Sequence, residues 1–163
     1  MERPERRPVR LKGYDYSSNA AYFVTICTHN RQELLSTIAV GEGLCALPVL
    51  TLTAIGQEVA RSIQHINSAY PTVSVDKYII MPNHVHLLIT LVPTGGHRGP
   101  PLPKLIGQFK SYTTHKFGKP LWQRSFYDHI VRNEEDYRSI WNYIDTNPVK
   151  WANDCFYGNP PHL

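Results

Sequence analysis

The hydrophobic residues of the chain follow two different periods, one typical of β-strands and one typical of α-helices. Short apolar and β-branched segments occupy residues 20–28 and 73–81, and a third, HVHLLITLV, occupies residues 84–92. Such segments predict strands that are buried in a core. The last two are separated only by a Pro-Asn turn, so they should pair as a hairpin. Residues 126–131 predict one further short strand.

Three longer segments carry apolar residues at helical spacing. Thr53 or Thr51 can cap the first helix, Gly118 can end the second, and Asn133 can cap the third. The acidic residues that follow Asn133 suit the positive end of a helix dipole. The expected core faces are Ile55, Val59, Ile63 and Ile66 in the first helix; Leu102, Leu105, Ile106, Phe109, Tyr112 and Thr113 in the second; and Tyr137, Ile140, Trp141 and Ile144 in the third.

The order of these elements predicts a fold class. Strand, helix, strand, strand, helix, strand, helix is the order of a ferredoxin-like α+β sandwich, an antiparallel sheet with helices packed on one face. Residues 36–50 show no clear period and predict a loop or a short hairpin. We expect one folded domain over residues 13–163, preceded by a basic, flexible arm over residues 1–12.

Composition adds only broad limits. The 163 residues are 42% hydrophobic, enough for one core. No signal peptide and no apolar run of the roughly 18 residues that a membrane span needs is present. Three cysteines without CxxC spacing favour a reduced, cytoplasmic protein. Because no long apolar run is present, we do not expect it to enter a membrane. The net charge of +4 is compatible with a polyanionic partner but is equally common in proteins without one.

Two histidines in one predicted strand are the main candidate for chemistry. His84 and His86 enclose Val85, and because strand side chains alternate, both imidazoles project to one side about 7 Å apart. Such a pair can bind a divalent metal, although a third ligand must come from elsewhere. The alternative is two exposed strand histidines without a role. His129, on the later short strand, could reach the same face or be a hydrogen-bonded structural histidine.

Several segments together resemble a known enzyme family. MPNHVHLLI (81–89) resembles the HUH signature, two histidines around one hydrophobic residue, of single-strand DNA nucleases. WQRSFYDH (122–129) and RNEEDYRSIWNYIDTNPVKW (132–151) resemble the REP-associated tyrosine transposases, a branch of the single-tyrosine HUH transposase family. RLKGYDYS (10–17) and YFVTICT (22–28) are similar to the opening of that family. The resemblance therefore covers nearly the whole chain.

The resemblance implies a ferredoxin-like fold and a metal-dependent endonuclease and strand transferase that acts on single-stranded or hairpin DNA. It implies Tyr143 as the nucleophile that forms a 5′-phosphotyrosine, and Mg²⁺ or Mn²⁺ bound by His84, His86 and Asn147. Tyr143 and Asn147 are four residues apart and so share one side of a helix, at the border of its apolar stripe. From the residues alone, Tyr143 could instead flank the core and Asn147 could merely stop the helix.

Other residues are candidates for holding the strand or competing with the nucleophile. Tyr112 lies in phase with the apolar stripe of its helix and has a lysine four residues later, so we expect it in the core. Cations that follow phosphates and aromatic rings that stack on unpaired bases are typical of single-strand binding. Trp122 could equally be a core residue. The DNA-binding candidates are Lys110, Trp122, Arg124 and Arg132.

Two other functions fit the same features. A catalytically silent nucleic-acid-binding module could share the fold. A metal hydrolase that activates water is the second alternative, but it normally needs carboxylate ligands, which the His84–His86 strand lacks. The family resemblance does not fix the oligomeric state: it is compatible with a monomer and with a homodimer that exchanges the tyrosine helix. No P-loop or GxGxxG pattern is present, so no nucleotide cofactor is expected.

Overall fold

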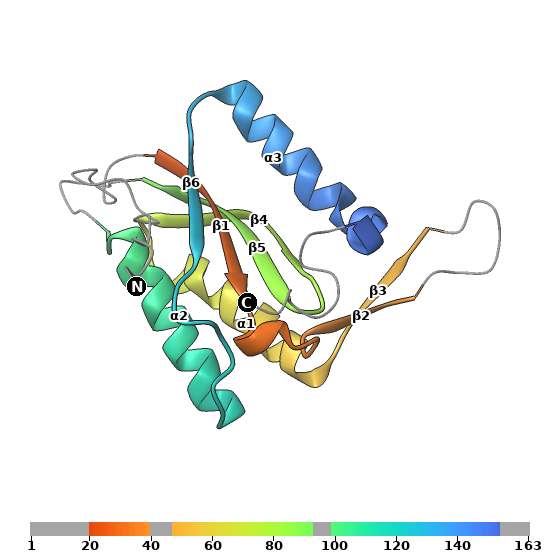
Figure 1. Ribbon diagram of the computed structural model, residues 1–163. Coiled ribbons are helices and arrows are strands. Elements are labelled where there is room, and N and C mark those ends of the chain that lie inside the picture. The colour runs from red at the N-terminus through yellow and green to blue at the C-terminus, as the bar shows by residue number, and fades with distance from the viewer. Residues whose placement is uncertain (1–19, 40–46, 93–98, 154–163) are drawn as a thin grey trace, which may run out of the picture.

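The protein is built around a four-stranded antiparallel sheet in strand order β4-β5-β1-β6 (Figure 1). The computed structural model describes residues 20–39, 47–92 and 99–153. The arm predicted at residues 1–12 lies outside these ranges. The strands of the sheet are β1 (Ala20–Cys27), β4 (Val73–Ile80), β5 (His84–Leu91) and β6 (Tyr127–Val131).

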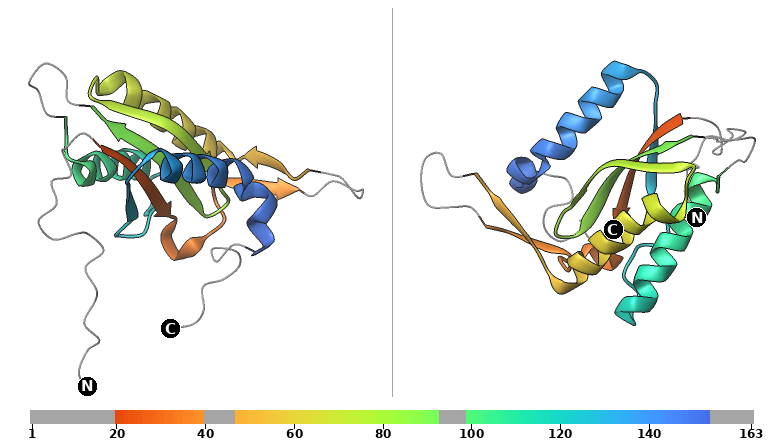
Figure 2. Two further views of the ribbon diagram at one scale, coloured as in Figure 1. Left: turned by 90° about the horizontal axis from the view of Figure 1, so that it is seen from above. Right: turned by 180° about the vertical axis from the view of Figure 1, so that it is seen from behind.

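The remaining elements surround this sheet. Two further strands pair as a separate hairpin that extends away from the sheet (Figure 2). Residues 36–50, predicted as a loop or a short hairpin, therefore hold the first strand of this hairpin and the beginning of the second. The hairpin and the helices have these bounds: β2 (Ser36–Ala39), β3 (Val49–Leu52), α1 (Ala54–Ala69), α2 (Leu102–Phe117), α3 (Glu134–Thr146), and the 3-10 helices η1 (His29–Arg31) and η2 (Asn147–Asn153).

The helix ends follow the local chemistry that the sequence predicted. The Thr53 side chain, rather than that of Thr51, accepts a hydrogen bond from the backbone N–H of Gly56 and caps α1. The Asn133 side chain accepts from the N–H of Asp136 and caps α3. Gly118 ends α2 with a φ of 75°, a left-handed conformation that glycine adopts without steric cost.

The helices lie on both faces of the sheet. Alternate residues of β1, among them Tyr22 and Val24, join a core with α1 and α2. The intervening Phe23 faces a second cluster, in which Leu88 packs against Ile140 and Ile144 of α3. The ferredoxin-like α+β class is thus confirmed, but the expectation of one covered face holds only for α1 and α2. The opposite face is also apolar, and α3 covers it (Figure 1).

Polar contacts tie α3 to the edge strand β4. The register of β4 shifts between Val75 and Lys77, which leaves Asp76 at a bulge. Asp76 accepts a hydrogen bond from the Tyr137 hydroxyl at 3.1 Å. Nζ of Lys77 lies 2.6 Å from an Asp145 carboxylate oxygen and 4.1 Å from the centre of the Trp141 ring. These contacts join α3 to β4, beside the apolar packing of α3 on the sheet.

Within the described part of the chain, no helix is both long and apolar enough to cross a bilayer. The longest have 16 residues.

Candidate active site

His84 and His86 lie on the face of the sheet that α3 covers, as strand alternation predicted. Their side chains are 0% and 1% exposed, so the alternative of two exposed histidines is wrong. The rings converge: their Nε2 atoms lie 3.0 Å apart and their centroids 4.5 Å apart. The pair thus directs two imidazole nitrogens at one point.

Each imidazole is held through its other ring nitrogen. Nδ1 of His84 lies 2.8 Å from the side-chain oxygen of Asn83, and Nδ1 of His86 lies 2.8 Å from the hydroxyl of Thr25 across the β1–β5 ladder. Because the Asn83 oxygen can only accept, Nδ1 of His84 carries the hydrogen and its Nε2 keeps a lone pair. The Thr25 hydroxyl can donate or accept, so it is compatible with either tautomer of His86.

Burial keeps both imidazoles neutral. Loss of hydration, with smaller effects from the charges of His86 and Arg31, lowers the pKa of His84 from 6.5 to about 2. Burial lowers the pKa of His86 from 6.5 to about 3. Neutral imidazole is the form that binds a metal ion. Both side chains are therefore in the ligating charge state at neutral pH.

The last turn of α3 brings the other two candidate residues to this face. The Tyr143 ring is 37% exposed, and its centroid lies 5.3 Å from that of His86 and 5.8 Å from that of Phe23. Asn147, one turn later, is 1% exposed and begins η2. The Trp151 ring of η2 lies 5.9 Å from the ring of His84. In the sequence, Asn147 lies midway between Tyr143, whose ring contacts His86, and Trp151, whose ring contacts His84.

This donor set fits a small divalent cation. Imidazole nitrogens and amide oxygens are both common ligands of divalent metal ions. The Nε2 atoms of His84 and His86 are 3.0 Å apart. Oδ1 of Asn147 is buried and has no hydrogen-bond partner within the described ranges. Across those ranges, no cluster of three or more His, Cys, Asp or Glu side chains could bind a metal ion. A buried amide oxygen without a partner is a donor of the type that hard divalent cations prefer.

The DNA-binding candidates fall into two groups. Trp122 is 7% exposed, and its indole N–H donates to the Thr113 hydroxyl at 2.7 Å, so the core interpretation accounts for it. Nζ of Lys110 donates to the backbone oxygens of Gln123 and Arg124 at 2.6 and 2.9 Å and so braces the segment before β6. The side chains of Arg124 and Arg132 are exposed.

Two other sequence interpretations are decided by the structure. Tyr112 is 50% exposed, so its prediction as a core residue was wrong. Thr113, predicted for the same core face, is buried, because the helix turns by about 100° per residue and Tyr112 lies at the edge of that face. His129 shares the face of the histidine pair, but its Nε2 lies 2.9 Å from a carboxylate oxygen of Asp136. The hydrogen-bonded structural role is the one observed for His129.

Sequence reasoning missed Thr25, Asn83 and Tyr127. Asn83 could have been found as the residue next to His84, since its side chain reaches back to that ring. Thr25 and Tyr127 join the site only through strand pairing: Thr25 stands opposite both His86 and Tyr127. No local pattern gives that register.

A hollow of about 260 Å³ adjoins His86. It is lined by Phe23, Thr25, His86, Tyr127 and Tyr143.

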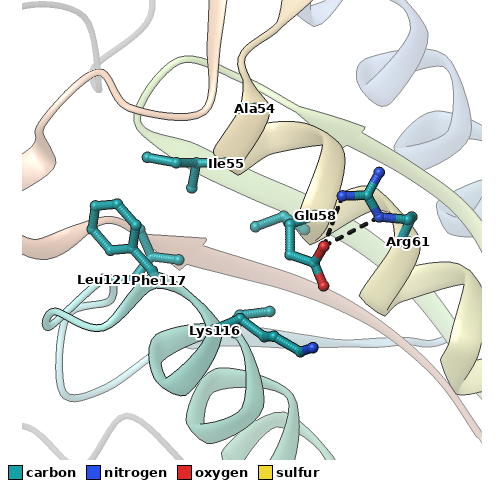
Figure 3. A pocket seen from close by; sticks show the side chains of 9 residues that line it. Ala54, Ile55, Glu58, Arg61, Lys116, Phe117 and Leu121 are labelled. Carbon is teal, nitrogen blue, oxygen red and sulfur yellow. Dashed lines mark hydrogen bonds and ion pairs between the residues drawn. The ribbon is translucent and has the colours of Figure 1, made fainter.

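A second hollow, of about 270 Å³, lies between α1 and α2 (Figure 3). It has an apolar wall that includes Ile55 and Phe117, and Glu58 on its rim is paired with Arg61. It contains no histidine or cysteine and no tyrosine. The hollow beside His86 is therefore the better candidate for an active site.

No protein-family model matches the chain. An uncharacterized protein of Haemophilus influenzae is 32% identical over 174 residues, which cover 93% of each chain. The REP-associated tyrosine transposase of Escherichia coli is 28% identical over 83% of this chain and 70% of its own length. A putative REP-associated tyrosine transposase of Haemophilus influenzae is 25% identical over 83% of this chain and 74% of its own.

A solved structure supports the same relationship. A REP-associated tyrosine transposase bound to a REP hairpin matches with a TM-score of 0.59 and 26% sequence identity. The match covers 92% of this chain and 74% of that one. The shared fold thus extends over nearly all of the present sequence.

Proposed function

Because this chain belongs to the family of REP-associated tyrosine transposases, we propose that it is a metal-dependent endonuclease and strand transferase that acts on single-stranded DNA. One observation carries the proposal. Tyr143 lies over His86, whose Nε2 atom converges with that of His84 in a buried, neutral pair. A nucleophile beside two potential metal ligands is the arrangement that phosphodiester transfer needs.

The proposed step is a transesterification with Tyr143 as the nucleophile. Its hydroxyl oxygen forms a bond to phosphorus, and the bond from phosphorus to the 3′ oxygen breaks. As this bond forms the Tyr143 hydroxyl gives up its proton, and the leaving 3′ oxygen takes up a proton, so the products are a 5′-phosphotyrosine and a free 3′-hydroxyl. One phosphoester replaces another, so a second 3′-hydroxyl can reverse the step and join a new strand. Phenols ionise near pH 10, so the attack needs help from the surrounding groups.

The ligands proposed for Mg²⁺ or Mn²⁺ are His84, His86 and Asn147. When bound there, the ion would supply positive charge to offset the charge that develops on the phosphate. The protein's part is to hold the ligands ready. The Asn83 oxygen fixes the tautomer of His84, and the Thr25 hydroxyl orients His86.

The proposed substrate is a single strand that carries a hairpin, because the matching solved structure is bound to a REP hairpin. The exposed cations Arg124 and Arg132 are proposed to contact its phosphates. Lys110 and Trp122 have partners within the protein, so we assign them a supporting role in shaping the segment between α2 and β6. The active form is proposed to be a monomer or a homodimer.

The test is a cleavage assay on single-stranded hairpin DNA with Mg²⁺ or Mn²⁺, resolved on a denaturing gel. We expect a covalent protein–DNA adduct and a released fragment with a 3′-hydroxyl. Tight single-strand binding without an adduct on any substrate would favour a silent binding module. Cleavage without a tyrosine link would favour hydrolysis by activated water.

Binding assays test the substrate class separately. Affinity should be higher for the single-stranded hairpin than for matching duplex, and should fall with salt at a log–log slope of about −0.7 for each phosphate neutralised. Deletion of residues 1–8, which are part of the basic arm, should make that slope shallower. An equal affinity for blunt duplex would contradict the proposed preference.

A further inference from the structure

Tyr127 occupies an unusual place beside the candidate nucleophile. It is the first residue of β6, an edge strand of the sheet, and stands opposite Thr25 in the β1–β6 ladder. Opposite residues of an antiparallel pair point to the same face. The Tyr127 side chain therefore lies on the face of His86 and lines the 260 Å³ hollow together with Tyr143.

The aromatic residues of this hollow differ in what they contact. The Phe23 ring stacks on His86 with centroids 5.0 Å apart and meets Tyr143 edge-on. Phe23 is thus engaged in holding those two side chains. The Tyr127 side chain is 56% exposed, and within the described ranges it has no hydrogen bond and no ring contact. A large aromatic ring so exposed at the rim of an apolar hollow is free to contact a ligand.

We propose that Tyr127 is a binding residue that stacks on an unpaired nucleobase next to the phosphate attacked by Tyr143. This inference rests on the proposed function and names a contact that the substrate makes at the same site. Aromatic rings stack on the faces of bases in single strands, whereas the bases of a duplex are already stacked on one another. Tyr127 would thereby help the hollow to select a single strand.

The lining of the hollow also favours a base over a sugar or phosphate in this position. Its walls are mainly aromatic, and its polar groups within reach of a base are few: the Thr25 hydroxyl is already paired with His86. A phosphate would need cations, and none of the residues that line the hollow is a lysine or an arginine. A flat, apolar face is what this wall offers, and stacking tolerates any base.

The experiment measures binding in a Tyr143→Phe background with EDTA present, so that no cleavage is required. The probe is a fluorescein-labelled DNA hairpin with a short single-stranded oligothymidylate tail. A second probe carries the same tail without bases. Loss of one base–aromatic stack weakens binding by roughly 5- to 150-fold. We expect Tyr127→Ala to lose that much affinity for the thymidylate tail and none for the abasic tail.

Two further variants separate a stacking role from a structural one. Tyr127→Phe keeps the ring and should bind as the parent does. Tyr112→Ala removes another exposed tyrosine, from α2 on the opposite face of the sheet, and should also leave affinity unchanged. Thermal unfolding of each variant checks that the fold is retained.

The outcomes also separate this inference from the proposed function. An unchanged affinity in Tyr127→Ala, an equal loss on the abasic tail, or an equal loss in Tyr127→Phe would overturn the stacking role. So would failure of the parent to bind the thymidylate tail. If Tyr127-dependent binding is found but the active chain forms no adduct, the stacking role stands and the transesterase proposal fails. An adduct without Tyr127 dependence gives the reverse result.

Discussion

The hydroxyl of Thr25 lies 2.8 Å from Nδ1 of His86, and both groups are buried. This contact leaves Nε2 of His86 directed at Nε2 of His84. A hydroxyl can change from donor to acceptor by rotating about its C–O bond. Nε2 of His86 can therefore donate its hydrogen to Nε2 of His84. If Nε2 of His86 were instead to bind a metal, its hydrogen would have to lie on Nδ1, where the Thr25 hydroxyl could accept it.

Replacing Thr25 with valine removes the hydroxyl and keeps the shape. We expect metal affinity to fall by roughly 10- to 100-fold, the range seen when a group that orients a metal ligand is lost. Titration with Mn²⁺, followed by the rise in unfolding temperature, measures the affinity without an activity assay. Thr25→Ser keeps the hydroxyl and should retain most of it. Equal Mn²⁺ affinities in the valine variant and the parent would contradict the orienting role.

The buried histidines should make the metal-free protein less stable in mild acid. Both pKa values are lowered on folding, from 6.5 to about 2 for His84 and about 3 for His86. Below pH 6.5 the unfolded chain takes up protons that the folded chain does not. Stability is therefore complete above pH 6.5 and falls as the pH drops toward the folded-state values, by about 1.4 kcal/mol per pH unit for each histidine.

Urea unfolding at a series of pH values in EDTA measures this effect. The double variant His84→Gln, His86→Gln should lose the corresponding part of the slope. His115→Gln, at an exposed position in the last turn of α2, is the matched control and should keep it. A slope that is the same in all three proteins would show that the pair does not titrate as proposed.

The nucleophile is tested by removing one hydroxyl. Tyr143→Phe removes the nucleophilic hydroxyl and should therefore lose the covalent adduct and nearly all cleavage. The fold should survive, because the ring keeps its edge-on contacts with His86 and Phe23. Tyr112→Phe should leave cleavage intact and change stability by less than about 0.5 kcal/mol, as is usual at an exposed site. Peptide mapping of the trapped adduct identifies the linked residue. A phosphotyrosine at any position other than 143 would exclude Tyr143 as the nucleophile.

Asn147→Ala should act on metal dependence before it acts on the fold. Oδ1 of Asn147 has no hydrogen-bond partner in the described ranges, so its removal breaks no hydrogen bond at that atom. We expect the Mn²⁺ concentration needed for half-maximal cleavage to rise on the order of tenfold or more, with activity partly restored by excess Mn²⁺. An unchanged Mn²⁺ requirement would remove Asn147 from the ligand set.

Substitutions of Trp122 and Arg124 should have opposite effects on stability and on DNA binding. Trp122→Phe breaks a buried hydrogen bond to Thr113 and should cost about 1–3 kcal/mol, measured by urea unfolding. Its DNA affinity, measured under conditions where the variant is folded, should match that of the parent. Arg124→Ala should instead keep stability within about 0.5 kcal/mol and make the salt slope of DNA binding shallower by about 0.7. If Trp122→Phe instead weakened DNA binding and kept its stability, Trp122 would be a DNA-binding residue and not a core residue.

The sequence by itself determined most of the helices and strands and the side of each element to which its residues point. Strand alternation assigned His84 and His86 to one face, and the cap at Asn133 and the left-handed end at Gly118 are where short-range chemistry predicted them. These properties depend on neighbours within a few residues, which the sequence supplies directly. The resemblance of the motif segments added the family, which the relatives confirm.

The tertiary structure alone decided how the elements meet. α3 lies on the second face because Ile140 and Ile144 pack there against Leu88, and the histidine pair on that same face is buried. The partnership of Thr25 with His86 and Tyr127 depends on strand register, which joins residues 61 positions apart in the first case. Tyr112 was misplaced because a helical stripe has edges, and packing across the helix decides which residue is the last one covered.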